Sequence, residues 1–113
     1  MSVTIYHNPR CSKSRATLEL LRSRGVQPAV IDYLKTPPTA AELRWLLRLL
    51  GLGAKDLIRM NEDEYKAIQH LDLDAEGLIA VMAKHPKLIQ RPIVVANNRA
   101  ALGRPPENVL AIL

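Results

Sequence analysis

The first part of the chain alternates between strand and helix patterns. Val3–Tyr6 is rich in β-forming residues and predicts a short strand, which Pro9 ends because proline cannot donate to a strand ladder. Apolar residues then recur every three or four positions over Ser12–Arg24, which predicts a helix that Gly25 stops. Ala29–Tyr33 predicts a second strand. A strand, a helix and a strand within about thirty residues predict a βαβ unit with parallel strands.

The middle of the chain shows helical patterns only. Thr39 and Glu42 form a predicted capping box, and leucines at helical spacing follow it until Gly51 ends the helix. Three shorter helices are predicted over 54–59, 62–70 and 75–84. The segment from about 39 to 85 is therefore predicted to be a helical insertion between two halves of a sheet.

The last part of the chain returns to a strand pattern. Pro92–Ala96 predicts a third strand, and Asn97-Asn98 predicts a two-residue turn because asparagine tolerates a positive φ. Arg99–Leu102 is expected to return antiparallel, and a last helix is predicted over Pro106–Leu113. The order β-α-β, helices, β-β-α predicts an α/β fold in which residues 1–113 form a single domain.

Composition narrows the class of protein. The 113 residues are 48% hydrophobic, which suits a globular domain with a real core and excludes a disordered chain. No apolar run approaches the roughly 18–20 residues that a membrane span needs, and Met1–Ile5 resembles a strand more than a signal peptide. A single cysteine without an export signal predicts a reduced thiol in the cytoplasm.

The net charge of +5 makes an anionic partner plausible, whether a nucleic acid, an acidic protein or a small oxyanion. The 16 lysines and arginines are spread along the chain with no run of five basic residues, so a nucleic-acid partner is not expected. His70 and His85 stand without a cluster of other metal-binding residues, so no metal site is predicted.

The one cysteine, Cys11, falls at the junction of the first strand and the first helix. The unpaired N–H groups and the positive dipole end of a helix start favour an anion at this position. Arg10, Lys13 and Arg15 add positive charge nearby. Because such surroundings lower a thiol pKa, Cys11 is predicted to be a nucleophilic thiolate. The alternative is a cysteine that merely occupies a loop.

Two neighbours could assist this thiol. Ser14 could donate a hydrogen bond to the sulfur, and His7 could do likewise or hold a charge. Ser14 stands where a C-x-x-C motif has its second cysteine, so the chain has no thiol of its own to resolve an adduct on Cys11. The resolving thiol must come from outside, for example from glutathione or a glutaredoxin. Thr17 stands where a low-molecular-weight phosphatase loop needs arginine, which sets that class aside.

Three arginines in other parts of the chain are candidates for binding a tetrahedral oxyanion, because guanidinium groups offer paired N–H donors. They are Arg59, Arg91 and Arg104. Each could also be a surface charge or the partner of a carboxylate. Pro92 follows Arg91 and is a candidate for a cis peptide bond, since only X-Pro bonds carry that option at low cost.

The chain resembles the glutaredoxin-coupled arsenate reductase family over almost its whole length. The motifs that carry the resemblance are His7-Asn8-Pro9-x-Cys11-x-x-Ser14-Arg15, Arg91-Pro92-Ile93-Val94-Val95 and Gly103-Arg104-Pro105. The resemblance implies a thioredoxin-like fold with a helical insertion. It also implies that the protein reduces arsenate to arsenite.

The resemblance further implies roles for individual residues. Cys11 is expected to attack arsenate, His7 and Ser14 to lower its pKa, and Pro92 to match the cis-proline of thioredoxin-like folds. The residues expected to bind the oxyanion and the arsenic intermediates are Asn8, Arg59, Arg91 and Arg104. Glutathione and glutaredoxin are expected to supply the electrons, with no tightly bound cofactor.

Two other functions stay open at this point. Spx-type transcriptional regulators share the fold and bind RNA polymerase, although their redox switch generally needs the second cysteine that Ser14 replaces. Another glutathione-dependent thiol reductase on the same scaffold is the second alternative. Iron–sulfur-binding monothiol glutaredoxins fit less well, because Cys11–Ser14 lacks their Gly-Phe pair.

Overall fold

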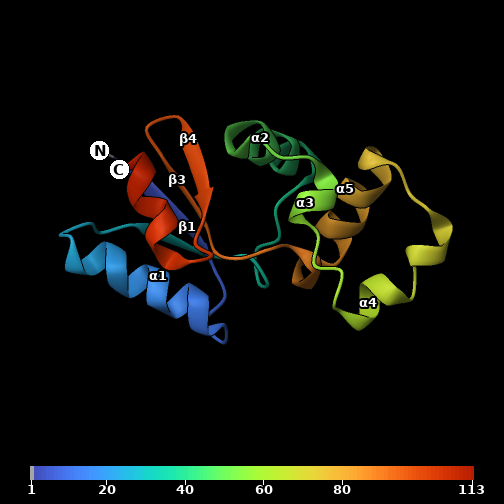
Figure 1. Ribbon diagram of the computed structural model, residues 1–113, viewed down its shortest axis with the longest axis horizontal. Helices are drawn as coiled ribbons and strands as arrows, with labels where there is room; N and C mark the ends of the chain where they lie inside the picture. Colours follow the sequence, from blue (N-terminus) through green and yellow to red (C-terminus); the bar gives the residue numbers. More distant parts are fainter. Residues whose placement is uncertain (1) are drawn as a thin grey trace. The chain divides into compact units, whose positions relative to one another are not determined.

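The computed structural model describes residues 2–113, and the chain divides into two compact units (Figure 1). The first unit contains the residues up to Thr36 together with Arg91–Leu113, and the second contains Pro37–Gln90. The predicted insertion, from about 39 to 85, falls inside the second unit. The chain therefore leaves the first unit once and returns to it once.

The first unit is built on a four-stranded sheet with the order β2-β1-β3-β4. The strands are β1 (Val3–His7), β2 (Ala29–Asp32), β3 (Ile93–Ala96) and β4 (Arg99–Leu102). β1 pairs parallel with β2 and antiparallel with β3, and β3 pairs antiparallel with β4. The predicted βαβ unit and the predicted hairpin are both confirmed.

The hairpin between β3 and β4 closes through the two asparagines. Asn97 and Asn98 have φ angles of 54° and 58°, the left-handed values that a tight two-residue turn requires. The amide of Asn97 donates to the carbonyl of Ile112 at 2.8 Å, and Arg99 donates to that of Ala111 at 3.1 Å. These bonds fasten the hairpin to the end of the chain.

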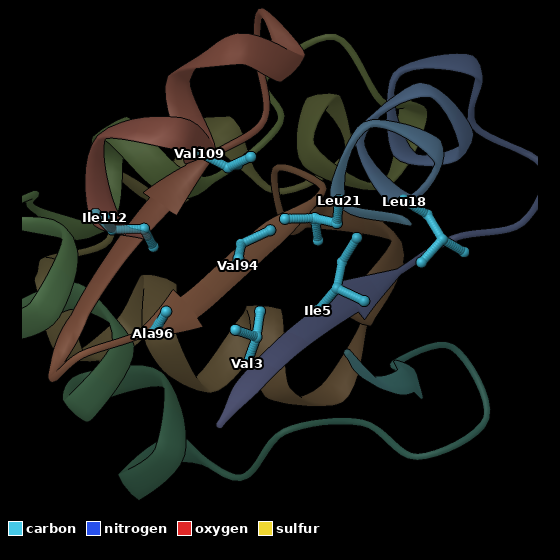
Figure 2. Packing of buried hydrophobic residues seen from close by; sticks show 8 residues of the cluster. All are labelled: Val3, Ile5, Leu18, Leu21, Val94, Ala96, Val109 and Ile112. Atoms are coloured by element: carbon cyan, nitrogen blue, oxygen red, sulfur yellow. The ribbon is translucent and has the colours of Figure 1, made fainter. Parts of the chain in front are cut away.

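The core of the first unit lies between the sheet and two helices. These are α1 (Ser12–Ser23) and the 3-10 helix η3 (Pro106–Ile112), and Figure 2 shows their side chains meeting those of β1 and β3. The core cluster consists of Val3, Ile5, Leu18, Leu21, Val94, Ala96, Val109 and Ile112. The helix predicted at the end of the chain is thus a 3-10 helix. Packing of α1 against the sheet fixes the loop that precedes it.

The second unit is helical. Its elements are α2 (Ala40–Leu50), α3 (Ala54–Leu57), α4 (Asp63–Lys66), η1 (Gln69–Leu71), α5 (Ala75–Lys84) and η2 (Pro86–Leu88). Thr39 caps α2 by accepting from the Glu42 amide at 3.1 Å, and Asp74 caps α5 by accepting from the Gly77 amide at 2.8 Å. α5 packs against both α2 and α3.

One helix of this unit differs from the prediction. The helix predicted over 62–70 is divided, since α4 ends at Lys66 and the 3-10 helix η1 begins at Gln69. Neither short helix contains a buried residue, so no apolar stripe packs to hold a longer helix in place. Among the described residues, no helix has the length and apolarity to cross a membrane.

Candidate active site

Cys11 lies in a tight loop between β1 and α1. Its amide donates to the carbonyl of Asn8 at 3.0 Å, and its own carbonyl accepts from the amide of Arg15 at 3.0 Å. Cys11 is the N-cap residue of α1, with an extended backbone, and its thiol is partly exposed. The sequence therefore places the sulfur at the helix start, and solvent can reach it.

The surroundings of Cys11 favour the thiolate. Burial raises the pKa of the thiol, but the amide of Ser14, the guanidinium of Arg91 and the amide of Lys13 outweigh it, so the pKa is lowered. The donors are thus arranged for the charged form, which is the nucleophilic form of a thiol.

Ser14 is fully buried, and its hydroxyl oxygen organises the loop. It accepts from the amide of Asn8 at 3.0 Å and lies 2.7 Å from Nδ1 of His7. The amide of Ser14 lowers the pKa of Cys11. Donation from the Ser14 hydroxyl to the sulfur stays a prediction. Through its contacts with His7 and Asn8, the hydroxyl holds the loop in position.

His7 is buried at the end of β1. Burial lowers its pKa, and the positive charges of Arg22 and Arg15 act in the same direction, although Asp32 opposes them. The imidazole is therefore neutral near pH 7. Holding a positive charge does not fit this environment, and the hydrogen bond that His7 makes is with Ser14. Donation from His7 to the sulfur stays a prediction.

Asn8 accepts two hydrogen bonds within the loop. Its side-chain oxygen accepts from the amide of Arg10 at 2.9 Å, and its carbonyl accepts from the amide of Cys11. Because an anion accepts hydrogen bonds, any contact of the Asn8 side chain with an anion must come from its NH₂ group. The role of Asn8 in binding substrate stays a prediction.

Arg91 and Arg104 are neighbours in the first unit. Nη1 of Arg104 donates to the carbonyl of Arg91 at 3.3 Å. The guanidinium of Arg91 lies close enough to Cys11 to lower its pKa by hydrogen bonding and by charge. The Arg91–Pro92 peptide bond is cis, as the sequence suggested, and Arg104–Pro105 is cis as well.

Gly103 lets the chain pass closely between α1 and Pro92. A Cβ atom there would approach Cγ of Pro92 to 2.7 Å and would also overlap with the side chain of Thr17. Gly103 donates to the carbonyl of Pro92 at 2.9 Å, and its own carbonyl accepts from Thr17 at 3.5 Å. The glycine thus joins the segment carrying Arg91 and Arg104 to the helix that begins after Cys11.

Arg59 belongs to the second unit. Its Nε atom donates to Glu62 at 3.2 Å, and its amide donates to the carbonyl of Leu88. Arg59 therefore has the carboxylate partner that the sequence analysis considered as an alternative. Its place among the oxyanion-binding residues stays a prediction.

Tyr33 is a site residue that sequence reasoning missed. It directly follows β2, and its side chain is 1% exposed. Burial raises the pKa of its hydroxyl, while Arg91 and Asn8 oppose that effect and the charge of Cys11 reinforces it. The available signal was its place at the carboxyl end of a strand parallel to the one that leads into the Cys11 loop.

A groove of about 320 Å³ runs along the Cys11 loop. Its walls are formed by Asn8, Pro9, Arg10, Asp32, Leu34 and Lys35. It combines two cationic side chains with one carboxylate and an apolar residue. Elsewhere in the described chain, no three His, Cys, Asp or Glu side chains gather closely enough to hold a metal ion.

The arrangement is suited to nucleophilic attack on an anion. A thiolate, the first amides of a helix and a guanidinium lie together, so the same groups can stabilise the sulfur and attract an oxyanion. With one cysteine in the chain, the thiol cannot form an intramolecular disulfide.

Comparisons with known proteins agree on one family. The model of the ArsC family matches residues 6–112. Arsenate reductase from Neisseria meningitidis is 47% identical over 98% of this chain and 97% of that protein. Uncharacterized protein YfgD of Escherichia coli K12 is 56% identical over 98% of this chain and 96% of that protein.

A solved structure gives the same result for the fold. Arsenate reductase from Vibrio cholerae superimposes with a TM-score of 0.96 and 53% identity, over 100% of this chain and 98% of that one. The thioredoxin-like α/β class expected from the sequence is confirmed.

Proposed function

The chain belongs to the ArsC family, and from this premise we propose that it reduces arsenate to arsenite with Cys11 as the nucleophile. The observation that carries the proposal is the lowered pKa of Cys11, caused by helix amides and the Arg91 guanidinium. Relatives named arsenate reductase support the choice of oxyanion.

The first step is attack by the Cys11 thiolate on the arsenic atom. A sulfur–arsenic bond forms, and one arsenate oxygen takes up protons and leaves as water. Arg91 offsets the negative charge of the approaching anion, and Arg104 lies beside it. We assign His7 to positioning, because its neutral ring holds the Ser14 hydroxyl that shapes the loop.

The electrons come from outside the protein. Reduction of As(V) to As(III) takes two electrons, which oxidation of two thiols to one disulfide supplies. The chain has one cysteine, so we propose that glutathione and a glutaredoxin provide these thiols. This exchange requires a reducing compartment, and we expect the protein to work in the cytoplasm.

The groove beside the loop is a suitable place for glutathione. Arg10 and Lys35 could pair with its carboxylates, and Asp32 could pair with its ammonium group. The groove shares Asn8 and Arg10 with the Cys11 loop, so a thiol bound there would be near the sulfur.

Arsenate turnover in the presence of glutathione and glutaredoxin tests the proposal. The wild-type protein should produce arsenite only when both are present, and Cys11→Ser should produce none. Ser12→Ala, an exposed neighbour, is the matched control and should retain activity. Turnover that survives Cys11→Ser would refute the assignment of the nucleophile.

The same preparation separates the proposal from its alternatives. If arsenate is inert while a glutathionylated peptide is reduced, the protein is a thiol reductase with another substrate. If neither is reduced and purified RNA polymerase is bound, the regulator alternative gains support.

A further inference from the structure

Tyr33 carries a buried hydroxyl with an unusual environment. The side chain is 1% exposed, and its oxygen forms no hydrogen bond within residues 2–113. A buried hydroxyl without a partner is costly to the folded state, and such groups often have a functional explanation. None of the steps proposed above uses this hydroxyl.

The position of Tyr33 connects it to the Cys11 loop. In the parallel pairing of β1 with β2, His7 lies opposite Asp32, so the next residues on the two strands are Asn8 and Tyr33. The segment from Asp32 to Lys35 also faces the Asn8–Arg10 loop across the groove. Tyr33 therefore leaves the sheet beside the loop that presents the nucleophile.

Apart from the Cys11 sulfur, the groups near the hydroxyl offer mainly donors. The side chains of Arg91 and Asn8 lie near it, and the Arg91 guanidinium and the Asn8 NH₂ group are donors. The Asn8 oxygen already accepts from the amide of Arg10 at 2.9 Å. The hydroxyl can therefore donate its hydrogen to a ligand that brings an acceptor. The oxygen atoms of an oxyanion are such acceptors.

We propose that the Tyr33 hydroxyl donates a hydrogen bond to the oxyanion bound at Cys11, which makes Tyr33 a further substrate-binding residue. The assignment rests on the proposed function for the identity of the oxyanion. Burial raises the pKa of Tyr33, so the phenol keeps its proton near neutral pH and remains a donor. Arg91 supplies charge from the segment before β3, whereas Tyr33 supplies a neutral donor from the end of β2.

This role predicts opposite effects of Tyr33→Phe on stability and on binding. In the free protein the substitution removes a polar group that has no partner, so the Tm should rise. With arsenate present, the variant lacks one hydrogen bond to a charged ligand. Affinity should then fall by about 10- to 100-fold, the usual range for a hydrogen bond to a charged group.

The experiment measures two quantities for each variant. Calorimetric titration of arsenate into the protein, without glutathione, gives the affinity, and thermal unfolding of the free protein gives the Tm. Tyr65→Phe, a tyrosine of the second unit, is the matched control and should leave arsenate affinity unchanged. A higher Tm with weaker arsenate binding in Tyr33→Phe alone supports the assignment. A lower Tm with unchanged affinity overturns it, because the hydroxyl would then be structural.

Cys11 itself is a possible acceptor, and the titration separates this case. If Tyr33→Phe raises the pKa of Cys11 in the free protein and leaves arsenate affinity unchanged, the hydroxyl serves the thiolate and the assignment fails. If wild-type protein binds arsenate but does not reduce it, the proposed function fails while the binding comparison still decides the role of Tyr33. If wild-type protein does not bind arsenate, both fail.

Discussion

Replacement of Ser14 by alanine is the most informative perturbation of the loop. Ser14 is fully buried, and its oxygen serves both the amide of Asn8 at 3.0 Å and Nδ1 of His7 at 2.7 Å. Alanine removes the oxygen and leaves both groups without this partner. Each buried polar group left unsatisfied costs about 1–3 kcal/mol, so for these two groups we expect a total loss of about 2–6 kcal/mol.

The expected change in Tm follows from this loss of free energy and from the entropy of unfolding, which scales with chain length. The entropy of unfolding is roughly 0.24 kcal/mol per kelvin for a chain of this length, so the Tm should fall by about 8–25 °C. Differential scanning calorimetry measures both the Tm and the enthalpy. Ser23→Ala is the matched control, because Ser23 lies on the same helix with an exposed hydroxyl bonded to the carbonyl of Leu20.

The same variant separates the two functions assigned to Ser14. The amide that lowers the pKa of Cys11 is retained in alanine, so the thiolate should persist wherever the variant is folded. A Ser14→Ala protein as stable as Ser23→Ala would refute the reasoning, because the hydroxyl would then not hold the loop.

Three further predictions follow from the first unit. Gly103→Ala should cost about 1–3 kcal/mol through overpacking, whereas Gly53→Ala meets only ordinary contacts, as urea unfolding can measure. Because burial lowers the pKa of His7, the unfolded chain binds more protons than the folded chain as the pH drops below about 6.5. The free energy of unfolding should therefore decrease with decreasing pH in this range. His7→Gln should show a smaller decrease. Lys35→Glu should raise the KM for glutathione about 3- to 10-fold but not that for cysteamine, which has no carboxylate, whereas Arg24→Glu should change neither.

The elements with strong local signals were predictable from the sequence. The asparagine pair demanded a tight turn, and the φ values of Asn97 and Asn98 confirm it. Thr39 and Asp74 mark helix starts through side-chain caps, which act over three residues and need no tertiary contact. Division of the predicted helix over 62–70 was not predictable, because a helical pattern does not reveal whether an apolar surface will pack against it.

The candidate site was predictable only in part. The position of Cys11 at a helix start follows from the local order of strand, loop and helix. The contact of Arg91 with the sulfur and the closeness of Tyr33 depend on which strands pair, a long-range feature that residue spacing does not contain. The hydrogen bonds of the Ser14 hydroxyl to His7 and to the Asn8 amide were not predictable, because the burial of His7 beside it is not visible in the sequence.

The central claim is that Cys11 is kept as a thiolate by helix amides and by Arg91. A pH titration of its ultraviolet thiolate absorbance tests this claim most directly, with Cys11→Ser as the blank and Arg91→Met as the comparison. We expect a pKa below the roughly 8.5 of a free cysteine, and a higher pKa in Arg91→Met. A wild-type pKa at or above that of free cysteine, unmoved by Arg91→Met, would contradict the account.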